Sequence, residues 1–266
     1  MKIKLDGVAE TLLITLNVRA KDYENPKSVL HDKKSFEIAS QLDYDFSKFD
    51  GAWASYYGTL ARAYIMDEEV KKFIEKYPDC TIVSIGCGLD TRFERVDNGK
   101  ITWYNLDLPE VIEIRKNFFK ENDRVKNISK SVFDDDWTKE IVINNKELLI
   151  VSEGVFMYFD ENEVKKILEI LVNNFNKFEL HLDLLYKGTV KFSKEHDTLK
   201  KMNNIVFKWG VKDGSEVVKL EPKLKQIGLI NFTKKMAKIL PFSKKIFIPL
   251  MWIVNNRLGM YTYNYN

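Results

Sequence analysis

The spacing of apolar residues along the chain changes at about residue 80. Before this point apolar positions recur every three or four residues, over "AETLLITLNVRA" at 9–20 and over "AWASYYGTLARAYIMDEEVKKFIEKY" at 52–77. A period of about 3.6 residues indicates amphipathic helices. We expect the first helix to end near Arg19 and residues 1–79 to form a helical cap.

After residue 80, short apolar runs alternate with helical patterns. Five runs are predicted strands: "CTIVSI" (80–85), "ITWYNLDL" (101–108), "VKNISKSVF" (125–133), "ELLIVSEG" (147–154) and "FELHLDLLY" (178–186). Pro109 suits the first turn of a helix, and Asp160 with Glu163 predicts a capping box at the start of another. Such alternation indicates a parallel sheet with helices on both faces.

The last part of the chain breaks this order. The run "LINFTKKM" (229–236) predicts a strand, and a helical stretch follows it. The final "MYTYNYN" alternates Tyr261, Tyr263 and Tyr265 with polar residues, as a strand does. A hairpin-like pair of strands is therefore expected at the end of the sheet.

Composition indicates an ordinary globular protein, with 45% hydrophobic and 30% charged residues. The net charge of +3 is too small to indicate a nucleic-acid partner. The charge is uneven, however, because no Asp or Glu occurs after Glu221 while eight Lys and Arg do. This basic segment is either a solvated face or an electrostatic funnel toward an anionic substrate or a membrane surface.

Cellular location is suggested by three weaker signals. Cys80 and Cys87 are too close for a structural disulfide and lack zinc-site spacing, which favours a reducing cytoplasm. The N-terminus is interrupted by Asp6 and Glu10 and so makes a poor signal peptide. The longest apolar stretch, "FIPLMWIV" at 247–254, is far short of the ~20 residues that span a bilayer.

The stretch "TIVSIGCGLDTRF" (81–93) holds the candidate ligand site. The first strand-to-helix turn of a parallel sheet is a usual ligand site, and Gly86 and Gly88 leave its backbone bare. Asp107, 21 residues after Gly86, ends the next apolar strand and can accept hydrogen bonds from both ribose hydroxyls. Together they predict a nucleoside site, unless Asp107 only caps the helix at Pro109.

The identity of the nucleoside follows from what the turn lacks. Thr91 stands where a dinucleotide fingerprint needs its third glycine, and Asp90 would repel a diphosphate. An NAD-dependent oxidoreductase is therefore poorly supported. No Gly-Lys-Ser/Thr follows either, which excludes a phosphate loop. S-adenosylmethionine, which carries a sulfonium, an ammonium and a carboxylate but no phosphate, suits this turn better.

Several motifs, taken together, resemble the leucine carboxyl methyltransferase family, particularly its bacterial polyketide-type O-methyltransferases. They are "AETLLITLNVRA", "DYDFSKF", "SIGCGLDTRFERV", "YNLDLPEVIEIRK", "KSVFDDDW" and "SEGVFMYF", and the match extends to about residue 190. The resemblance implies a class I enzyme that converts S-adenosyl-L-methionine to S-adenosyl-L-homocysteine. It also implies a Rossmann-like α/β fold with a seven-stranded sheet, mostly parallel with an antiparallel last strand.

The resemblance further implies one domain, with a helical cap (1–79), a cofactor-binding core (80–185), a lid insert (186–215) and C-terminal helices and strands (216–266). The site residues that it implies are Gly86, Cys87 and Gly88 along the methionyl group, Asp107 with Leu108 at the ribose, Ser131 and Val132 by the adenine, Arg62 or Arg19 at the carboxylate, and Glu153 by the amine. Ser131 replaces an acid that is common in the family. The competing interpretations are surface positions for the arginines and a helix cap for Glu153.

No catalytic residue is assigned. A carboxylate acceptor needs no base, whereas a hydroxyl acceptor does. Of His31, His181 and His196, only His181 is close enough to the sheet edge to be tested as a base, and Tyr158 is a candidate for orienting an acceptor. The acidic run at 134–136 resembles a metal site but is better explained as a helix cap, so no metal is expected.

The leading hypothesis is an O-methyltransferase acting on a hydroxyl or carboxylate of a small molecule. Phe192, Phe207 and Trp209 in the lid favour an aromatic or apolar acceptor, unless they belong to the core, and the basic segment allows an anionic one. Two alternatives stay open. One is methyl esterification of a protein carboxyl terminus, and the other is a non-catalytic S-adenosylmethionine-binding module. The sequence determines neither the acceptor nor the oligomeric state.

Overall fold

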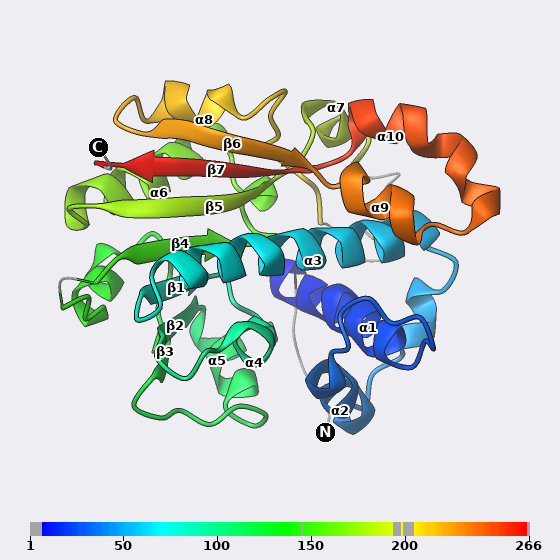
Figure 1. Ribbon diagram of the computed structural model, residues 1–266, viewed down its shortest axis with the longest axis horizontal. Coiled ribbons are helices and arrows are strands. Elements are labelled where there is room, and N and C mark those ends of the chain that lie inside the picture. Colours follow the sequence, from blue (N-terminus) through cyan, green and yellow to red (C-terminus); the bar gives the residue numbers. More distant parts are fainter. Residues whose placement is uncertain (1–6, 145, 194–197, 199–204, 265–266) are drawn as a thin grey trace.

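A computed structural model describes residues 7–144, 146–193, 198 and 205–264. At its centre is a seven-stranded sheet in the order β3-β2-β1-β4-β5-β7-β6 (Figure 1). The strands are β1 (Thr81–Ile85), β2 (Thr102–Asp107), β3 (Val125–Ser129), β4 (Leu148–Ser152), β5 (Phe178–Leu184), β6 (Lys225–Asn231) and β7 (Arg257–Tyr263). Strands β1 to β5 pair in parallel, and β7 runs antiparallel to both of its neighbours. The predicted Rossmann-like architecture is confirmed.

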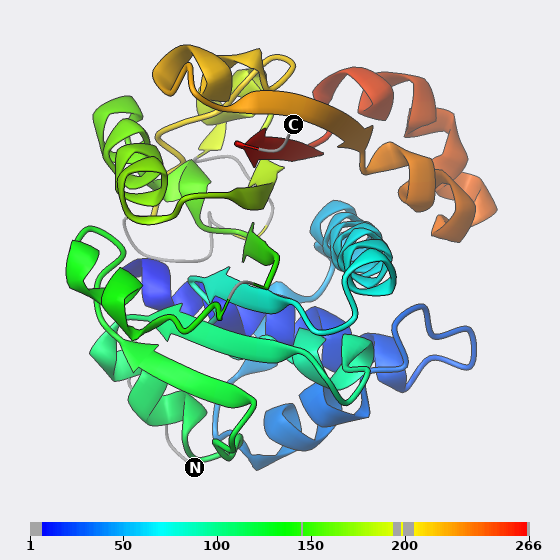
Figure 2. The same ribbon diagram turned by 60° about the vertical axis from the view of Figure 1, so that its left-hand side comes forward.

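Helices cover both faces of the sheet (Figure 2). They are α1 (Leu12–Tyr23), α2 (Lys33–Gln41), α3 (Trp53–Lys76), α4 (Arg92–Val96), α5 (Pro109–Arg115), α6 (Glu161–Asn174), α7 (Lys187–Val190), α8 (Ser215–Leu220), α9 (Thr233–Ile239) and α10 (Ile248–Val254). The long α3 was predicted from its periodicity. Among the described residues, no helix has the length and apolarity needed to cross a bilayer.

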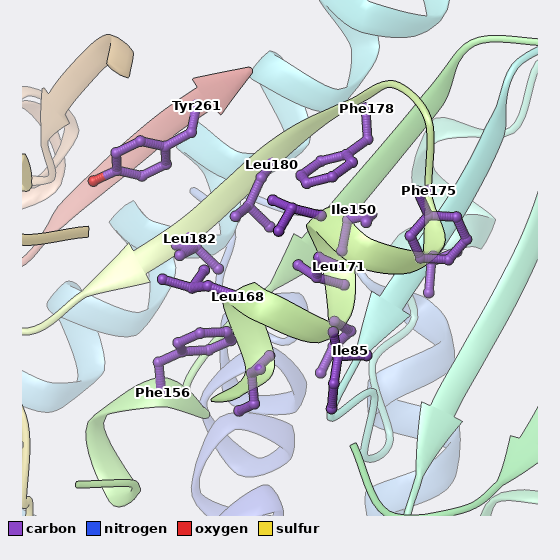
Figure 3. Packing of buried hydrophobic residues seen from close by; sticks show 14 of the residues in the cluster. Ile85, Ile150, Phe156, Leu168, Leu171, Phe175, Phe178, Leu180, Leu182 and Tyr261 are labelled. Atoms are coloured by element: carbon purple, nitrogen blue, oxygen red, sulfur yellow. The ribbon is translucent and has the colours of Figure 1, made fainter. Parts of the chain in front are cut away.

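The core is divided between the two faces because successive side chains of a strand point in opposite directions. In β4, Leu148 and Ile150 join the cluster under α6, while Leu149 and Val151 join the cluster under α3. The continuous apolar run of this strand therefore reflects burial on both sides. Figure 3 shows the α6 side, where Leu168 meets side chains of β5.

Helix α1 continues to Tyr23, four residues beyond the predicted end near Arg19. The prediction was wrong because the helix continues past Arg19 and includes Asp22. Both are buried. The Asp22 carboxylate accepts hydrogen bonds from the backbone of Val29 and Leu30, which folds the following loop back onto the helix.

The strand predicted at 229–236 was placed too late. It runs over Lys225–Asn231, and helix α9 starts at Thr233. The buried Phe232 and Met236 are four residues apart, a helical spacing that the strand interpretation overlooked. The final strand was predicted correctly at Tyr261, which is buried, and Tyr263, which is partly buried; Tyr265 lies outside the described residues.

The predicted lid starts with α7 and includes a bridge between Tyr186 and Val211. Its aromatic residues have different surroundings. Phe192 is exposed, Trp209 packs in the core cluster under α6, and Phe207 packs against Tyr158. His196 lies outside the described residues.

The capping box at the start of α6 is confirmed. The Asp160 side chain accepts from the Glu163 N–H at 2.9 Å, and the Glu163 carboxylate accepts from the Asp160 N–H at 2.7 Å. Asp160→Ala is expected to lower the free energy of unfolding by about 0.5–2 kcal/mol, because the helix loses a cap. Asp160→Asn, which keeps an acceptor, should be close to wild type. Urea denaturation of the three proteins measures both values, and equal losses would contradict the role of the cap.

Candidate functional site

A cavity of about 910 Å³ lies where the parallel strands end. Residues that follow β1, β2 and β4 form its floor, and side chains of α1, α3 and α10 form its walls. All ten residues predicted to bind the cofactor line it: Arg19, Arg62, Gly86, Cys87, Gly88, Asp107, Leu108, Ser131, Val132 and Glu153. The topology thus brings together positions as far apart in the chain as Arg19 and Glu153.

The two glycines of the turn have positive φ angles, +66° at Gly86 and +47° at Gly88. A Cβ on Gly86 would lie 2.3 Å from a Val155 methyl carbon, and one on Gly88 would lie 3.2 Å from the Leu12 Cβ. Packing therefore forbids a side chain at Gly86 and would be tight at Gly88, and the positive φ disfavours one at both positions. At Gly86 the close neighbour is Val155, where the sequence had suggested a ligand.

Asp107 points toward the glycine turn. Its Oδ2 accepts from the Gly88 N–H at 2.7 Å and its Oδ1 from the Leu108 N–H at 2.8 Å. Leu108 takes the cap position of α5 and no side chain caps this helix, so Asp107 is not the cap considered from the sequence. A carboxylate offers about four lone-pair sites, which leaves capacity for ribose hydroxyls. Burial raises the pKa of Asp107.

Arg62 of α3 reaches the ends of β4 and β5. Its Nε donates to Glu153 Oε1 and its Nη1 to Asp183 Oδ2, both at 2.8 Å. Gly154 has a positive φ, and a Cβ there would lie 3.4 Å from Arg62 Nη2. Arg62 is therefore an inward-facing residue, and Glu153 binds arginines where the sequence also allowed a helix cap.

The ion pairs continue from Glu153 across the glycine turn. Arg92 binds the second oxygen of Glu153 and donates to Asp67 and Asp90, both at 2.7 Å. Asp67 also binds Arg95. Arg92, Asp67 and Arg95 were not predicted as site residues. Two signals were available, since Arg92 follows the turn directly and Asp67 interrupts the apolar side of a long helix.

The chain of ion pairs ends at α1 and α2. Arg95 Nη1 lies 3.0 Å and Arg19 Nε lies 3.2 Å from Asp32 Oδ2. The Thr91 hydroxyl donates to the same oxygen, which gives a structural reason for threonine where a dinucleotide fingerprint has glycine. Arg19 Nη2 donates to the Leu89 carbonyl at 3.0 Å. Arg19 is thus a buried residue, not a surface one, and it connects the cap to the turn through its contacts with Asp32 and Leu89.

The arginines control ionisation in this network. Burial alone would raise the pKa of Asp90 and Glu153, but Arg92 with its neighbouring arginines outweighs burial and lowers both values. Asp183 differs. Burial and the nearby charge of Glu153 raise its pKa to about 6 in spite of Arg62. The site therefore keeps Glu153 ionised and holds one carboxyl that titrates near neutral pH.

The remaining candidates separate into two groups. Ser131 Oγ accepts from the Phe133 N–H at 3.3 Å, and Tyr158 lines the cavity with its pKa raised by burial. His181 lies in the middle of β5, with its Nε2 2.7 Å from Glu179 Oε1, and is not among the lining residues. His181 is therefore not positioned to act as a base in the cavity.

The acidic run at 134–136 acts as the predicted helix cap, because the Asp134 side chain accepts from the Asp136 N–H. In the described part of the chain, no group of His, Cys, Asp and Glu is arranged to hold a metal. Cys80 and Cys87 are free and buried, and burial raises the pKa of both thiols.

The cavity has a polar end and an apolar end. Charged and backbone groups gather at the glycine turn, whereas the rest of the wall is mostly apolar and aromatic: Trp53, Phe133, Phe207, Phe232, Phe247 and Met251. The polar end offers groups of both signs to a zwitterion. The apolar end offers a surface from which water is displaced by a flat or hydrophobic molecule.

The chain is similar in sequence to known proteins. The leucine carboxyl methyltransferase family model matches residues 14–172. The tetracenomycin polyketide synthesis O-methyltransferase TcmP of Streptomyces glaucescens is 33% identical over 210 residues, which cover 79% of this chain and 77% of TcmP. The S-adenosyl-L-methionine-dependent methyltransferase dpfgK of Gibberella zeae is 32% identical over 190 residues, 65% of this chain and 63% of dpfgK.

A solved structure supports the fold. Magnesium protoporphyrin IX methyltransferase from Synechocystis PCC 6803, crystallised with S-adenosylhomocysteine, superimposes with a TM-score of 0.51. The superposition covers 94% of this chain and all of the other, at 9% sequence identity. At this identity, the superposition shows a shared fold.

The raised pKa of Asp183 makes stability depend on pH. Between about pH 4 and pH 6 the folded state holds a proton on this carboxyl that the unfolded state has lost, so wild-type stability falls as pH rises through this window. Asp183→Asn removes that dependence. The free energy of unfolding of Asp183→Asn, measured relative to wild type at the same pH, should therefore be higher at about pH 7.5 than at about pH 5 by roughly 1 kcal/mol.

Urea titrations at the two pH values measure this difference. Asp123→Asn, at an exposed position between β2 and β3, is the control and should follow wild type at both. Parallel pH profiles for Asp183→Asn and wild type would contradict the assignment.

Proposed function

This chain belongs to the leucine carboxyl methyltransferase family, whose members use S-adenosylmethionine, and we propose that it transfers the methyl group to an oxygen of a small apolar or aromatic molecule. The main support for this proposal is that the Asp107 carboxylate and the glycine turn meet at one end of a cavity whose other end is apolar. The name of one relative agrees with this acceptor class, since TcmP is an O-methyltransferase of polyketide synthesis.

We propose that the residues of the polar end bind the cofactor as follows. Asp107 accepts from the ribose hydroxyls with the lone pairs that Gly88 and Leu108 leave. Arg62 attracts the carboxylate of the methionyl group and Glu153 its ammonium. The two side chains are paired with each other at 2.8 Å, so they present opposite charges side by side, as an amino acid zwitterion requires.

The other residues have supporting roles in this proposal. Gly86, Cys87 and Gly88 run along the methionyl chain, Leu108 packs beside the ribose, and Ser131 and Val132 lie by the adenine. Arg19 acts through the turn, because it holds the Leu89 carbonyl. We also propose one functional domain, in which residues 1–79 and 186–215 cover the core at 80–185 and residues 216–266 complete the sheet.

S-adenosylmethionine supplies a methyl group that is already activated as a sulfonium. The chain's own task is then to orient the acceptor oxygen and exclude water, which contributes through effective concentration. The aromatic wall, with Trp53, Phe133 and Phe207, fits this task. The raised pKa of Tyr158 keeps its hydroxyl protonated, so Tyr158 can orient an acceptor but is not a base.

Replacing Asp107 tests the cofactor site. Asp107→Ala should weaken binding of S-adenosylhomocysteine by about 10- to 150-fold, because hydrogen bonds to a charged group contribute about 1.5–3 kcal/mol. Isothermal titration calorimetry measures the loss. Asp123→Ala is the matched control on the exposed loop before β3 and should bind as wild type. Unchanged affinity in Asp107→Ala would show that the carboxylate only braces the turn.

An acceptor panel tests the reaction. Transfer of labelled methyl from S-adenosylmethionine should occur to aromatic hydroxyls or aromatic carboxylic acids that fit beside the cofactor in the cavity of about 910 Å³. Peptides ending in leucine are the comparison substrates. Activity confined to such peptides would replace the small-molecule acceptor by a protein terminus. Tight cofactor binding without turnover on any acceptor would support a binding module.

A further inference from the structure

The segment from Phe242 to Val254, here called the apolar arm, exposes an unusual set of hydrophobic side chains. It comprises the 3₁₀ helix Phe242–Phe247 and α10, at the edge of the molecule beside α9 (Figures 1 and 2). The exposed members are Phe242 (91%), Ile246 (79%), Phe247, Leu250, Trp252, Ile253 (59%) and Val254. Single exposed apolar residues are ordinary, but a contiguous group marks an interaction surface.

Lysines predominate on α9 and the arm. Lys234, Lys238 and Lys245 are exposed on α9 and the arm, and no Asp or Glu follows Glu221 in the chain. Lys244 lies over the Trp53 ring at 4.8 Å, and Lys235 lies over the Tyr64 ring. An acid on a neighbouring element is Glu68 of α3, whose charge acts on Lys235. The arm therefore combines apolar side chains with a basic rim.

This combination favours a lipid surface over a protein partner. Protein interfaces are depleted of lysine, whereas interfacial membrane segments join apolar residues, often with tryptophan, to Lys and Arg. Anionic headgroups attract such lysines. The arm, from Phe242 to Val254, is too short to span a bilayer, so it would lie in the membrane–water interface.

The arm is also a wall of the cavity. Phe247, Leu250, Met251 and Val254 line it, and Phe247 packs against Trp53 at a ring distance of 5.6 Å. Leu250 is both exposed and cavity-lining, so the cavity opens where the apolar face is presented.

We propose that the apolar arm docks the protein on an anionic lipid bilayer. Phe242, Ile246 and Ile253 enter the headgroup region and the lysines of α9 and the arm face the anionic headgroups. In this orientation the cavity opens toward the bilayer. An acceptor dissolved in the membrane can then reach the apolar end without crossing water, a consequence that rests on the proposed function although the docking itself does not.

Co-sedimentation with vesicles tests the docking. Wild type should bind vesicles of phosphatidylcholine mixed with phosphatidylglycerol, bind phosphatidylcholine alone weakly, and be released by salt. Lys238→Gln and Lys245→Gln should each weaken binding about fivefold. The matched control is Lys225→Gln, at the end of β6 that is remote from α9.

The apolar contribution is tested in the same assay. The double variant Ile246→Ser with Ile253→Ser should lose about tenfold or more of its affinity for the mixed vesicles. Ile227→Ser, which is 53% exposed on β6, is the control and should bind as wild type. All variants should bind S-adenosylhomocysteine with unchanged affinity. This calorimetric readout separates failure of docking from failure of the proposed function.

Three outcomes would overturn the docking. The first is no binding to mixed vesicles, and the second is an equal loss in the control variants. The third is a dimer in sedimentation velocity that dissociates in the double isoleucine variant, because a second copy of the chain would then cover the arm.

Discussion

A buried chain of alternating charges joins the helical cap to the edge of the sheet. It runs from Asp183 through Arg62, Glu153, Arg92, Asp67, Arg95 and Asp32 to Arg19. Removing one partner from such a pair leaves an uncompensated buried charge, which costs about 3–5 kcal/mol. The cap helices and the core therefore depend on one another.

This dependence prepares the site. Because Arg62 and Glu153 are each held by two partners of opposite charge, their side chains need little ordering when a ligand arrives. The same network leaves Asp183 with a raised pKa of about 6, close to Glu153. The raised pKa means that Asp183 lowers the stability of the fold near neutral pH, where its carboxylate pairs with Arg62 at the cavity wall.

The cavity and the arm extend this arrangement outward. The polar end is held by the ion pairs of Arg62, Glu153 and Arg92, whereas the apolar end takes side chains from α3, from the segment after β3 and from α10. A common donor site and a separate apolar wall are the division expected when one fold serves many acceptors.

The local features could be predicted before the fold was known. The strand run before Gly86, the acid at the end of β2 and the capping box at Asp160 depend on neighbouring residues, so periodicity and spacing predicted them. Which buried charges meet could be seen only in the folded chain. Arg92 and Asp32 are 60 positions apart and are linked through Asp67 and Arg95, and no local pattern reports such pairing, because an ion pair depends on distance in space.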